Sequence, residues 1–164
     1  QRCEQVGDVV WDYHSQKPCG KVPFLAAVWP DAPEFTEHYF NLRWEAPGNM
    51  MLDSGIVALD SDRKVGSHTP MANLITPADE NQTHYFWNQA RDMRADDKEL
   101  DQKIQMAVTK TFSTEDGKMI ADCREMMGTA DLMSLNPVLL PGDAASMRAR
   151  RIMARKIDEE RALA

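Results

Sequence analysis

The stretch Thr76-Pro-Ala-Asp-Glu-Asn-Gln-Thr-His-Tyr-Phe-Trp87 decides how the middle of this chain folds. It opens with a polar segment, 77–82, in which proline and the neighbouring Asp and Asn residues favour a turn. It closes with the aromatic run Tyr85-Phe86-Trp87, which favours the pleated surface of a β-strand. We therefore predict that strands at 71–76 and 83–93 flank this turn.

A second hairpin is predicted upstream of the first. Residues 39–45 alternate apolar and polar side chains, which is the period-two pattern of a half-buried strand. The turn sequence Pro47-Gly48-Asn49 follows, and 51–59 then continue with small, branched and apolar residues. We also expect a strand at 9–13 and a polar loop at 60–67, while 23–29 fit either a short helix or a buried strand.

The second half of the chain changes to helical periodicity. Apolar side chains recur at every third or fourth position over 100–112, after an Asp96/Glu99 pair that resembles a capping box. The same spacing returns over 119–127, and Gly128 marks the end of that helix. These residues therefore predict two helices.

A last helix is predicted after a loop at 131–142. Asp143 is placed to cap it, and pairs such as Arg155 with Glu159 would make its charged side a solvated face. Its apolar stripe would consist of Ala145, Ala149, Ile152, Met153 and Ile157. Strands first and helices after predict an α+β domain, an antiparallel sheet with C-terminal helices laid on one face.

Length and charge limit the classes of function. The 164 residues suit one domain with a real core, since a domain of this size buries roughly 70% of its unfolded surface. Lys and Arg total 19 against 26 Asp and Glu, and the net charge of −7 argues against nucleic acid and anionic membranes as partners. No apolar stretch approaches the roughly 20 residues that span a bilayer, so we expect a cytoplasmic protein.

Short motifs exclude further classes. The cysteines are odd in number, far apart and without C-x-x-C spacing, which argues against a disulfide framework and against a cysteine-ligated metal within these residues. No Walker A, G-x-S-x-G or G-x-G-x-x-G sequence occurs, so nucleotide binding and serine hydrolysis have no support. The chain begins at Gln1 rather than at methionine, which indicates a fragment.

Asp116 is the residue whose position suggests chemistry. If the helices at 100–112 and 119–127 are nearly continuous, Asp116 lies among apolar side chains, where its charge would require a cation, a metal or several hydrogen-bond donors. Alternatively, Glu115-Asp116-Gly117 forms a turn in which Asp116 caps the second helix and Gly117 has a left-handed backbone. Periodicity leaves both arrangements open.

Several short sequences, taken in order, resemble a known family. Together they are similar to the C-terminal part of Rieske-type non-haem iron aromatic oxygenases, in the branch of vanillate O-demethylase and dicamba monooxygenase. The resemblance covers nearly all of the chain and implies a helix-grip, START-like catalytic domain. The sequences are Arg43-Trp44, Met50-Met-Leu-Asp53, Leu74-Ile-Thr-Pro77, Thr83-His-Tyr-Phe-Trp87, Ala90-Arg-Asp92, Glu115-Asp-Gly-Lys118 and Ala149-Arg-Arg-Ile152.

The resemblance implies an oxidoreductase that demethylates or hydroxylates an aromatic compound. Electrons would come from NAD(P)H through a separate reductase and a [2Fe-2S] Rieske cluster, and the subunits would form a homotrimer. The resemblance also implies a mononuclear Fe(II) held by two histidines and one carboxylate, and Asp116 matches the carboxylate ligand.

The other ligands of these centres have no match in the chain. His14, His38, His68 and His84 are scattered, and the paired Cys and His motif of a Rieske cluster is absent. In the family's order both lie upstream. Residues 1–164 would then be the C-terminal part of the catalytic domain, without the Rieske domain and the two-histidine segment, and inactive alone.

By the same resemblance, Asp53 and Asn73 line the substrate pocket. Strand alternation places Asp53 on one face with Met51, and Asn73 on one face with Met71, so each would set a polar group among apolar neighbours. An anionic Asp53 would favour a phenol, amide or amine group over a carboxylate.

Two other classes of function remain as alternatives. A non-catalytic helix-grip module would bind apolar small molecules without a metal. A purely structural domain would use Asp116 as a helix cap and would have no cavity beside that side chain.

Overall fold

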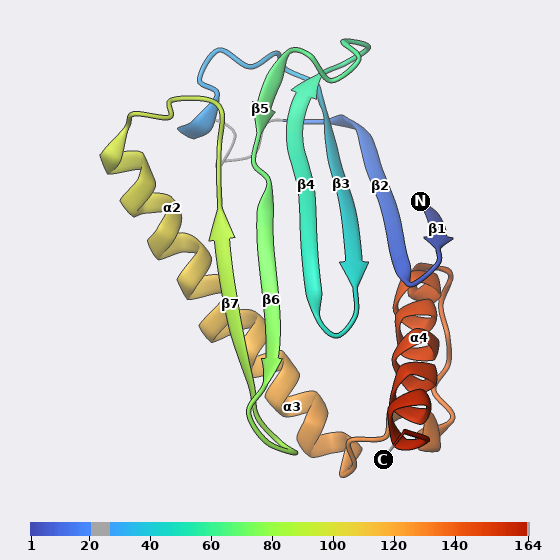
Figure 1. The fold of residues 1–164 in the computed structure, drawn as a ribbon. Coiled ribbons are helices and arrows are strands. Elements are labelled where there is room, and N and C mark those ends of the chain that lie inside the picture. Colours follow the sequence, from blue (N-terminus) through green and yellow to red (C-terminus); the bar gives the residue numbers. More distant parts are fainter. Residues whose placement is uncertain (21–26, 164) are drawn as a thin grey trace. The chain divides into compact units, whose positions relative to one another are not determined.

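The computed structural model describes residues 1–20 and 27–163 (Figure 1). Composition predicts one core, whereas the structure divides the chain into two compact units. The first unit combines Gln1–Met93 with Leu140–Ala164, and the second is Arg94–Leu139.

Over residues 1–20 and 27–93, the described strands of the first unit form a seven-stranded sheet in which every pairing is antiparallel. Its strand order is β1-β2-β3-β4-β6-β7, and the short β5 pairs with β4 beyond the end of β6 (Figure 1). The strands are β1 (Arg2–Val6), β2 (Val9–Cys19), β3 (Thr36–Glu45), β4 (Asn49–Ala58), β5 (Gly66–His68), β6 (Met71–Pro77) and β7 (Thr83–Gln89).

Both predicted hairpins are confirmed. β3 and β4 pair from Glu45↔Asn49 outward, and β6 and β7 pair from Pro77↔Thr83 outward. The turn within 77–82 is closed by Asp79, whose side-chain Oδ1 accepts from the backbone N–H groups of Asn81 at 2.7 Å and Gln82 at 2.9 Å. The sequence patterns of strands and turns therefore predicted correctly that β3 pairs with β4 and β6 with β7.

Other strand boundaries differ from the prediction. β7 ends at Gln89 rather than at residue 93, and β2 continues to Cys19. β1 is missing from the prediction because its mixed residues show no alternation. β5 begins at the end of the loop predicted at 60–67, where it pairs with the part of β4 that β6 leaves open. The undecided segment 23–29 falls mainly outside the described residues, and 27–28 are helical.

The last helix, α4 (Ala144–Arg161), packs against β1 and β2 of the same unit. Ile152, from the predicted apolar stripe, is its buried residue. The predicted cap is wrong: Asp143 makes no side-chain cap to α4, because it belongs to the 3₁₀ turn Pro141–Asp143 and accepts from the backbone N–H of Leu140 at 2.8 Å. The Arg155–Glu159 pair is confirmed at 2.7 Å.

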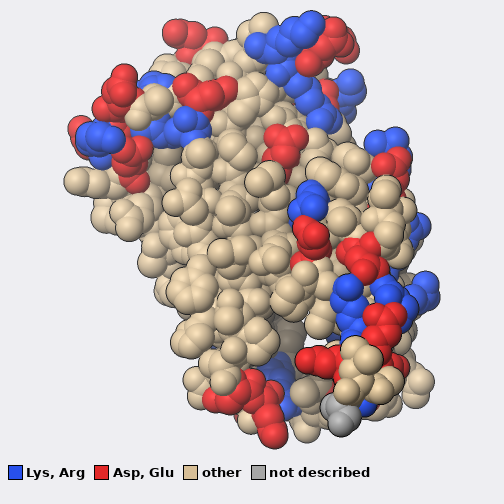
Figure 2. Space-filling view, viewed as in Figure 1, with Lys and Arg blue, Asp and Glu red and all other residues tan. Residues whose placement is uncertain are grey.

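Charges on this unit are mixed rather than segregated. Figure 2 shows acidic and basic side chains interspersed over α4, and a mostly uncharged surface over β6 and β7. Arg155 and Lys156 both form ion pairs with Asp8, in the β1–β2 turn. These contacts join the end of the chain to its beginning.

The second unit is one nearly continuous helical rod followed by a short turn. It consists of α2 (Lys98–Lys110), the π-helical segment η1 (Thr111–Asp116), α3 (Gly117–Met127) and a 3₁₀ turn, η2 (Leu132–Leu135). The cap of α2 is Asp97, one residue after the predicted Asp96, and its carboxylate accepts from the backbone N–H of Leu100 at 2.9 Å. α3 ends at Gly128 as predicted, with a left-handed φ of 63°.

Candidate functional site

The π-helical segment η1 widens the helical rod between α2 and α3. The backbone N–H of Gly117 donates to the carbonyl of Phe112, five residues earlier, instead of four. Ser113 Oγ donates to the Thr109 carbonyl at 2.7 Å, and Thr114 Oγ1 donates to the Lys110 carbonyl at 2.8 Å. These two hydroxyl groups donate to backbone carbonyls beside the widened turn. Single π-helical turns inside α-helices are frequent at functional sites.

Gly117 is required by the close approach of backbone within this segment. A Cβ atom at this position would lie 2.9 Å from the Phe112 carbonyl oxygen, nearer than side-chain carbons come to backbone. Its φ of −61° is an ordinary right-handed value. The glycine is therefore needed for space rather than for a left-handed turn.

Asp116 is the last residue of η1. Its own φ is −65°, and its side chain makes no cap hydrogen bond to α3. The alternative in which Asp116 caps a second helix after a left-handed Gly117 is therefore wrong, and the continuous-helix arrangement is right. Within the described residues, no hydrogen-bond or ion-pair partner is recorded for the Asp116 carboxylate.

The expected burial of Asp116 is not found. Its side chain is exposed, and so are those of Met119 (64%) and Ile120 (69%) on the following turn. Periodicity correctly placed the carboxylate beside apolar residues, but a single helical rod has no second layer of its own to cover that side. Among residues 1–20 and 27–163, no group of three or more His, Cys, Asp or Glu side chains is placed to hold a metal ion.

Asn73 lies in an apolar row that crosses the sheet of the first unit. The register pairs Trp44 with Met50, Met50 with Asn73, and Asn73 with Trp87, so these side chains share one face of β3, β4, β6 and β7. Asn73 is only 5% exposed, and its Oδ1 accepts a hydrogen bond of 2.7 Å from the hydroxyl of Tyr85. The prediction of a polar group among apolar neighbours is confirmed for this residue.

Asp53 lies on the opposite face of the sheet from Asn73. Because Met50 pairs with Asn73, Asp53 points with Met51 to the other side. Its carboxylate accepts from Asn41 Nδ2 at 3.0 Å and lies 3.5 Å from the hydroxyl of Tyr39. Asp53 therefore shares its face with Met51, as predicted, but its neighbours on β3 are the polar groups of Asn41 and Tyr39. Its role in lining a substrate pocket stays a prediction.

A polar cluster extends from Asp53 along that face, and the sequence did not predict it. The Tyr39 hydroxyl lies 2.6 Å from His68 Nδ1, and the Arg63 guanidinium lies 4.2 Å from the centre of the Tyr39 ring. Tyr39 is 3% exposed, and burial, followed by the charge of Asp53, raises its pKa to about 12. Tyr39 is therefore a protonated phenol at neutral pH. The residues come from separate strands and from the loop between β4 and β5, so the sequence alone could not reveal the cluster.

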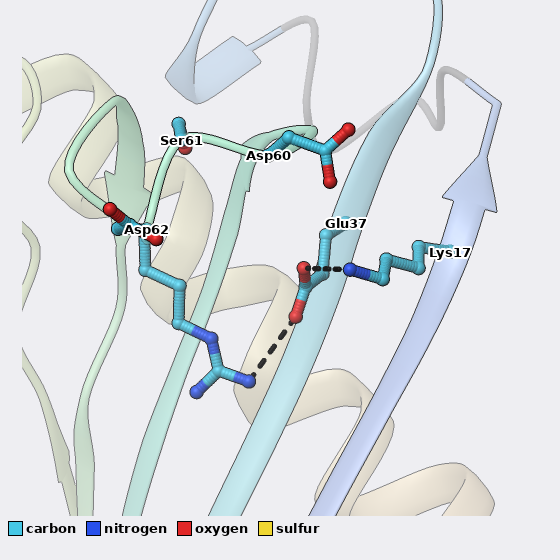
Figure 3. A pocket seen from close by; sticks show the side chains of 6 residues that line it. Lys17, Glu37, Asp60, Ser61 and Asp62 are labelled. Carbon is cyan, nitrogen blue, oxygen red and sulfur yellow. Dashed lines mark hydrogen bonds and ion pairs between the residues drawn. The ribbon is translucent and has the colours of Figure 1, made fainter.

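A hollow of about 360 Å³ lies beside this cluster (Figure 3). The Glu37 carboxylate lies between Lys17 Nζ at 3.5 Å and an Arg63 guanidinium nitrogen at 3.2 Å. A hydrogen bond from Ser15 lowers the pKa of Glu37, burial opposes this, and Arg63 and Lys17 lower it further. The remaining lining residues are Asp60, Ser61 and Asp62. The ion pairs with Lys17 and Arg63 satisfy the Glu37 carboxylate.

A second hollow, of about 420 Å³, is lined by residues of α2 and η1. Neither of these two hollows is lined by Asp116, Asp53 or Asn73. Within the part of the chain that the structure describes, no helix has both the length and the apolar character needed to cross a bilayer.

Comparison with known proteins gives a family match over almost the whole chain. The model of the vanillate O-demethylase oxygenase C-terminal domain matches residues 1–159. A chloroacetanilide N-alkylformylase oxygenase component from Rhizorhabdus wittichii is 33% identical over 149 residues, which cover 89% of this chain and 42% of the relative. A vanillate O-demethylase oxygenase subunit from a Pseudomonas species is 24% identical, covering 73% of this chain and 37% of the relative.

Solved structures show the same fold. Dicamba monooxygenase bound to 3,6-dichlorosalicylic acid superposes with a TM-score of 0.90 at 17% identity, covering 98% of this chain and 47% of that one. Dicamba monooxygenase with non-haem iron and dicamba gives a TM-score of 0.72 at 18% identity, covering 99% and 50%. The predicted α+β class, an antiparallel sheet with C-terminal helices, is thus confirmed. The chain spans about half the length of the proteins it matches, or less.

Proposed function

Because this chain belongs to the family of vanillate O-demethylase oxygenase C-terminal domains, we propose that it is part of an aromatic-compound monooxygenase or O-demethylase of the Rieske non-haem iron type. The match over residues 1–159 is the observation that carries the proposal. The curated relatives are all named as oxygenase components or subunits, which favours an oxidoreductase over a non-catalytic module for apolar ligands.

Asp116 is the proposed carboxylate ligand of a mononuclear Fe(II). Its side chain fits this role because it is exposed, lies at the end of the π-helical segment and has no recorded partner within the described residues. A solved relative is described as containing non-haem iron, which supports the choice of metal. When bound, the iron would supply the redox chemistry of oxygen activation, and Asp116 would hold it through a carboxylate oxygen.

The other components of the reaction are proposed from the family resemblance. Two histidine ligands and a [2Fe-2S] Rieske cluster would be supplied by parts of the protein other than residues 1–164, and a reductase would deliver electrons from NAD(P)H. A homotrimer is the expected assembly. In this proposal the chain contributes one metal ligand and part of the surface that holds the substrate.

An aromatic substrate is proposed for the apolar row on the sheet. Trp44, Met50 and Trp87 offer flat and adaptable apolar surface, and Asn73 places one amide among them. A few polar groups among apolar ones are how small-molecule sites orient a ligand. A substrate contact by Asp53 stays a prediction, and it would require a ligand on the opposite face of the sheet.

The test uses the full-length protein that contains this chain. We expect Asp116→Ala to lose mononuclear iron and turnover of an aromatic methyl ether, while the absorbance of the [2Fe-2S] cluster is retained. Glu115→Ala is the matched control, because it removes the adjacent exposed carboxylate from the same helical segment. Full mononuclear iron occupancy and normal turnover in Asp116→Ala would contradict the proposal.

A further inference from the structure

The hydrogen bond between Tyr85 and Asn73 determines which end of the Asn73 amide is available to a ligand. An asparagine amide has an acceptor oxygen and a donor nitrogen, and a tyrosine hydroxyl can pair with either. The separation of 2.7 Å from the Tyr85 hydroxyl to Asn73 Oδ1 is typical of O–H···O bonds, whereas N–H···O bonds are centred at about 2.9–3.0 Å. The hydroxyl therefore donates to Oδ1, and the amide nitrogen points away from it.

Among residues 1–20 and 27–163, the amide nitrogen of Asn73 has no acceptor. Within the described residues no hydrogen bond from Asn73 Nδ2 is recorded, although the residue is only 5% exposed. Unlike the fully enclosed polar atoms that lack a partner, this nitrogen keeps some exposed surface. The N–H groups therefore reach a surface that a ligand can approach, in a row that is otherwise apolar.

We propose that Tyr85 is a positioning residue that holds the Asn73 amide with its N–H groups toward the ligand. The site then selects an aromatic ligand that carries a hydrogen-bond acceptor beside the ring, such as an amide carbonyl. This inference rests on the proposed function only in taking the ligand to be aromatic. A ligand without the acceptor leaves a nearly buried donor unpaired and should therefore bind more weakly.

The position of Tyr85 on its strand suits this role. Tyr85 is the cross-strand partner of Ile75, so its hydroxyl reaches Asn73 diagonally along β6. Its neighbour Phe86 points to the other face of the sheet and is similarly exposed, 57% against 45% for Tyr85. Phe86 is therefore a matched control for changes in β7 that do not touch Asn73.

The test measures binding by the full-length protein, without turnover, to two ligands that differ in one group. N-methylacetanilide has a carbonyl beside the aromatic amine, and N-ethyl-N-methylaniline has a methylene in its place. We expect the parent protein and Phe86→Leu to bind the anilide roughly 3- to 10-fold more tightly, as one neutral hydrogen bond predicts. Tyr85→Phe should reduce this preference, and Asn73→Asp, which replaces the donor by an acceptor, should abolish it.

The outcomes separate the inference from the proposed function. Equal binding of both ligands by the parent protein, or an unchanged preference in Tyr85→Phe and Asn73→Asp, would overturn the inference alone. A parent protein that binds neither ligand would overturn the inference together with the aromatic substrate. Circular dichroism of each variant shows that it is folded, so a changed preference reports on the amide and not on the sheet.

Discussion

The hydroxyl oxygen of Tyr39 lies 2.6 Å from Nδ1 of His68, and this contact links β3 to β5 across β4. Asp92 holds His68 from the other side: its Oδ1 accepts from the His68 backbone N–H at 2.8 Å, and its Oδ2 lies 3.8 Å from Nε2. Asp92 follows β7 in the chain, so the cluster ties together segments that are far apart in sequence. β5, with only three residues, depends on such contacts.

Removing the Tyr39 hydroxyl should therefore loosen β5. We expect Tyr39→Phe to lower the free energy of unfolding by about 1 kcal/mol, the usual net contribution of one such hydrogen bond. Hydrogen exchange at the amides of Gly66–His68 should become faster, while β6 and β7 change little. Tyr13→Phe is the control, since Tyr13 stacks on Trp11 and no hydrogen bond of its hydroxyl is recorded within the described residues. Equal effects of the two changes would contradict this role for the cluster.

Because the pKa of Tyr39 is raised, we expect the free energy of unfolding to fall at high pH. Burial and the Asp53 charge raise the pKa of Tyr39 to about 12 in the folded protein, against an ordinary value of 10.0. Between these two values the unfolded chain has released a proton that the folded protein keeps, so the free energy of unfolding falls as the pH rises. We expect urea denaturation from pH 10 to 12 to show this fall, and Tyr39→Phe to show a shallower one. Identical slopes would mean that Tyr39 ionises normally.

Because the pKa of Glu37 is lowered, we expect the free energy of unfolding to fall as the pH is lowered. The Ser15 hydroxyl, Arg63 and Lys17 lower the pKa of Glu37 from its ordinary 4.5, so its contribution to stability is present above that pH and is lost as the pH falls through the lowered value. We expect Glu37→Gln to unfold at a lower urea concentration at pH 6 and to lose less stability on acidification below pH 4.5. Glu34→Gln, an exposed carboxylate, should follow the parent protein throughout.

Strand pairing could be predicted from the sequence because it depends on neighbouring residues. The alternation around Phe40, Leu42 and Trp44 and the turn before Thr83 correctly indicated the two hairpins. Alternation within one strand cannot say which of its two faces matches a face of the next strand. The pairing of Met50 with Asn73 decides that, and it separates Asn73 from Asp53.

The helical part shows the same limit. Periodicity placed Asp116 beside Met119 and Ile120, but it carries no information about what covers that side, and all three side chains are exposed. The widened turn was also missed, because it depends on a backbone hydrogen bond from Gly117 to Phe112. The run Thr111-Phe-Ser-Thr-Glu-Asp-Gly117 contains its only local indication, which is hydroxyl side chains followed by a glycine.

Gly117 offers a test of whether the widened turn sets the direction of Asp116. A Cβ atom at residue 117 would lie 2.9 Å from the Phe112 carbonyl oxygen, so Gly117→Ala must shift this backbone. If the segment tightens to an ordinary α-helix, the residues on its two sides rotate relative to each other by roughly 100°, the turn per residue of an α-helix. We therefore expect Gly117→Ala in the full-length protein to lose most of its mononuclear iron while its helix content is preserved.

Cys123→Ala is the control for this change, because it alters an exposed position on α3 without touching the widened turn. It should retain iron as the parent protein does. Asp116→Ala provides the reference for complete loss of the carboxylate. If Gly117→Ala keeps full iron occupancy while Asp116→Ala loses it, the carboxylate binds iron without the help of the π-helical segment, and the positioning role of Gly117 is wrong.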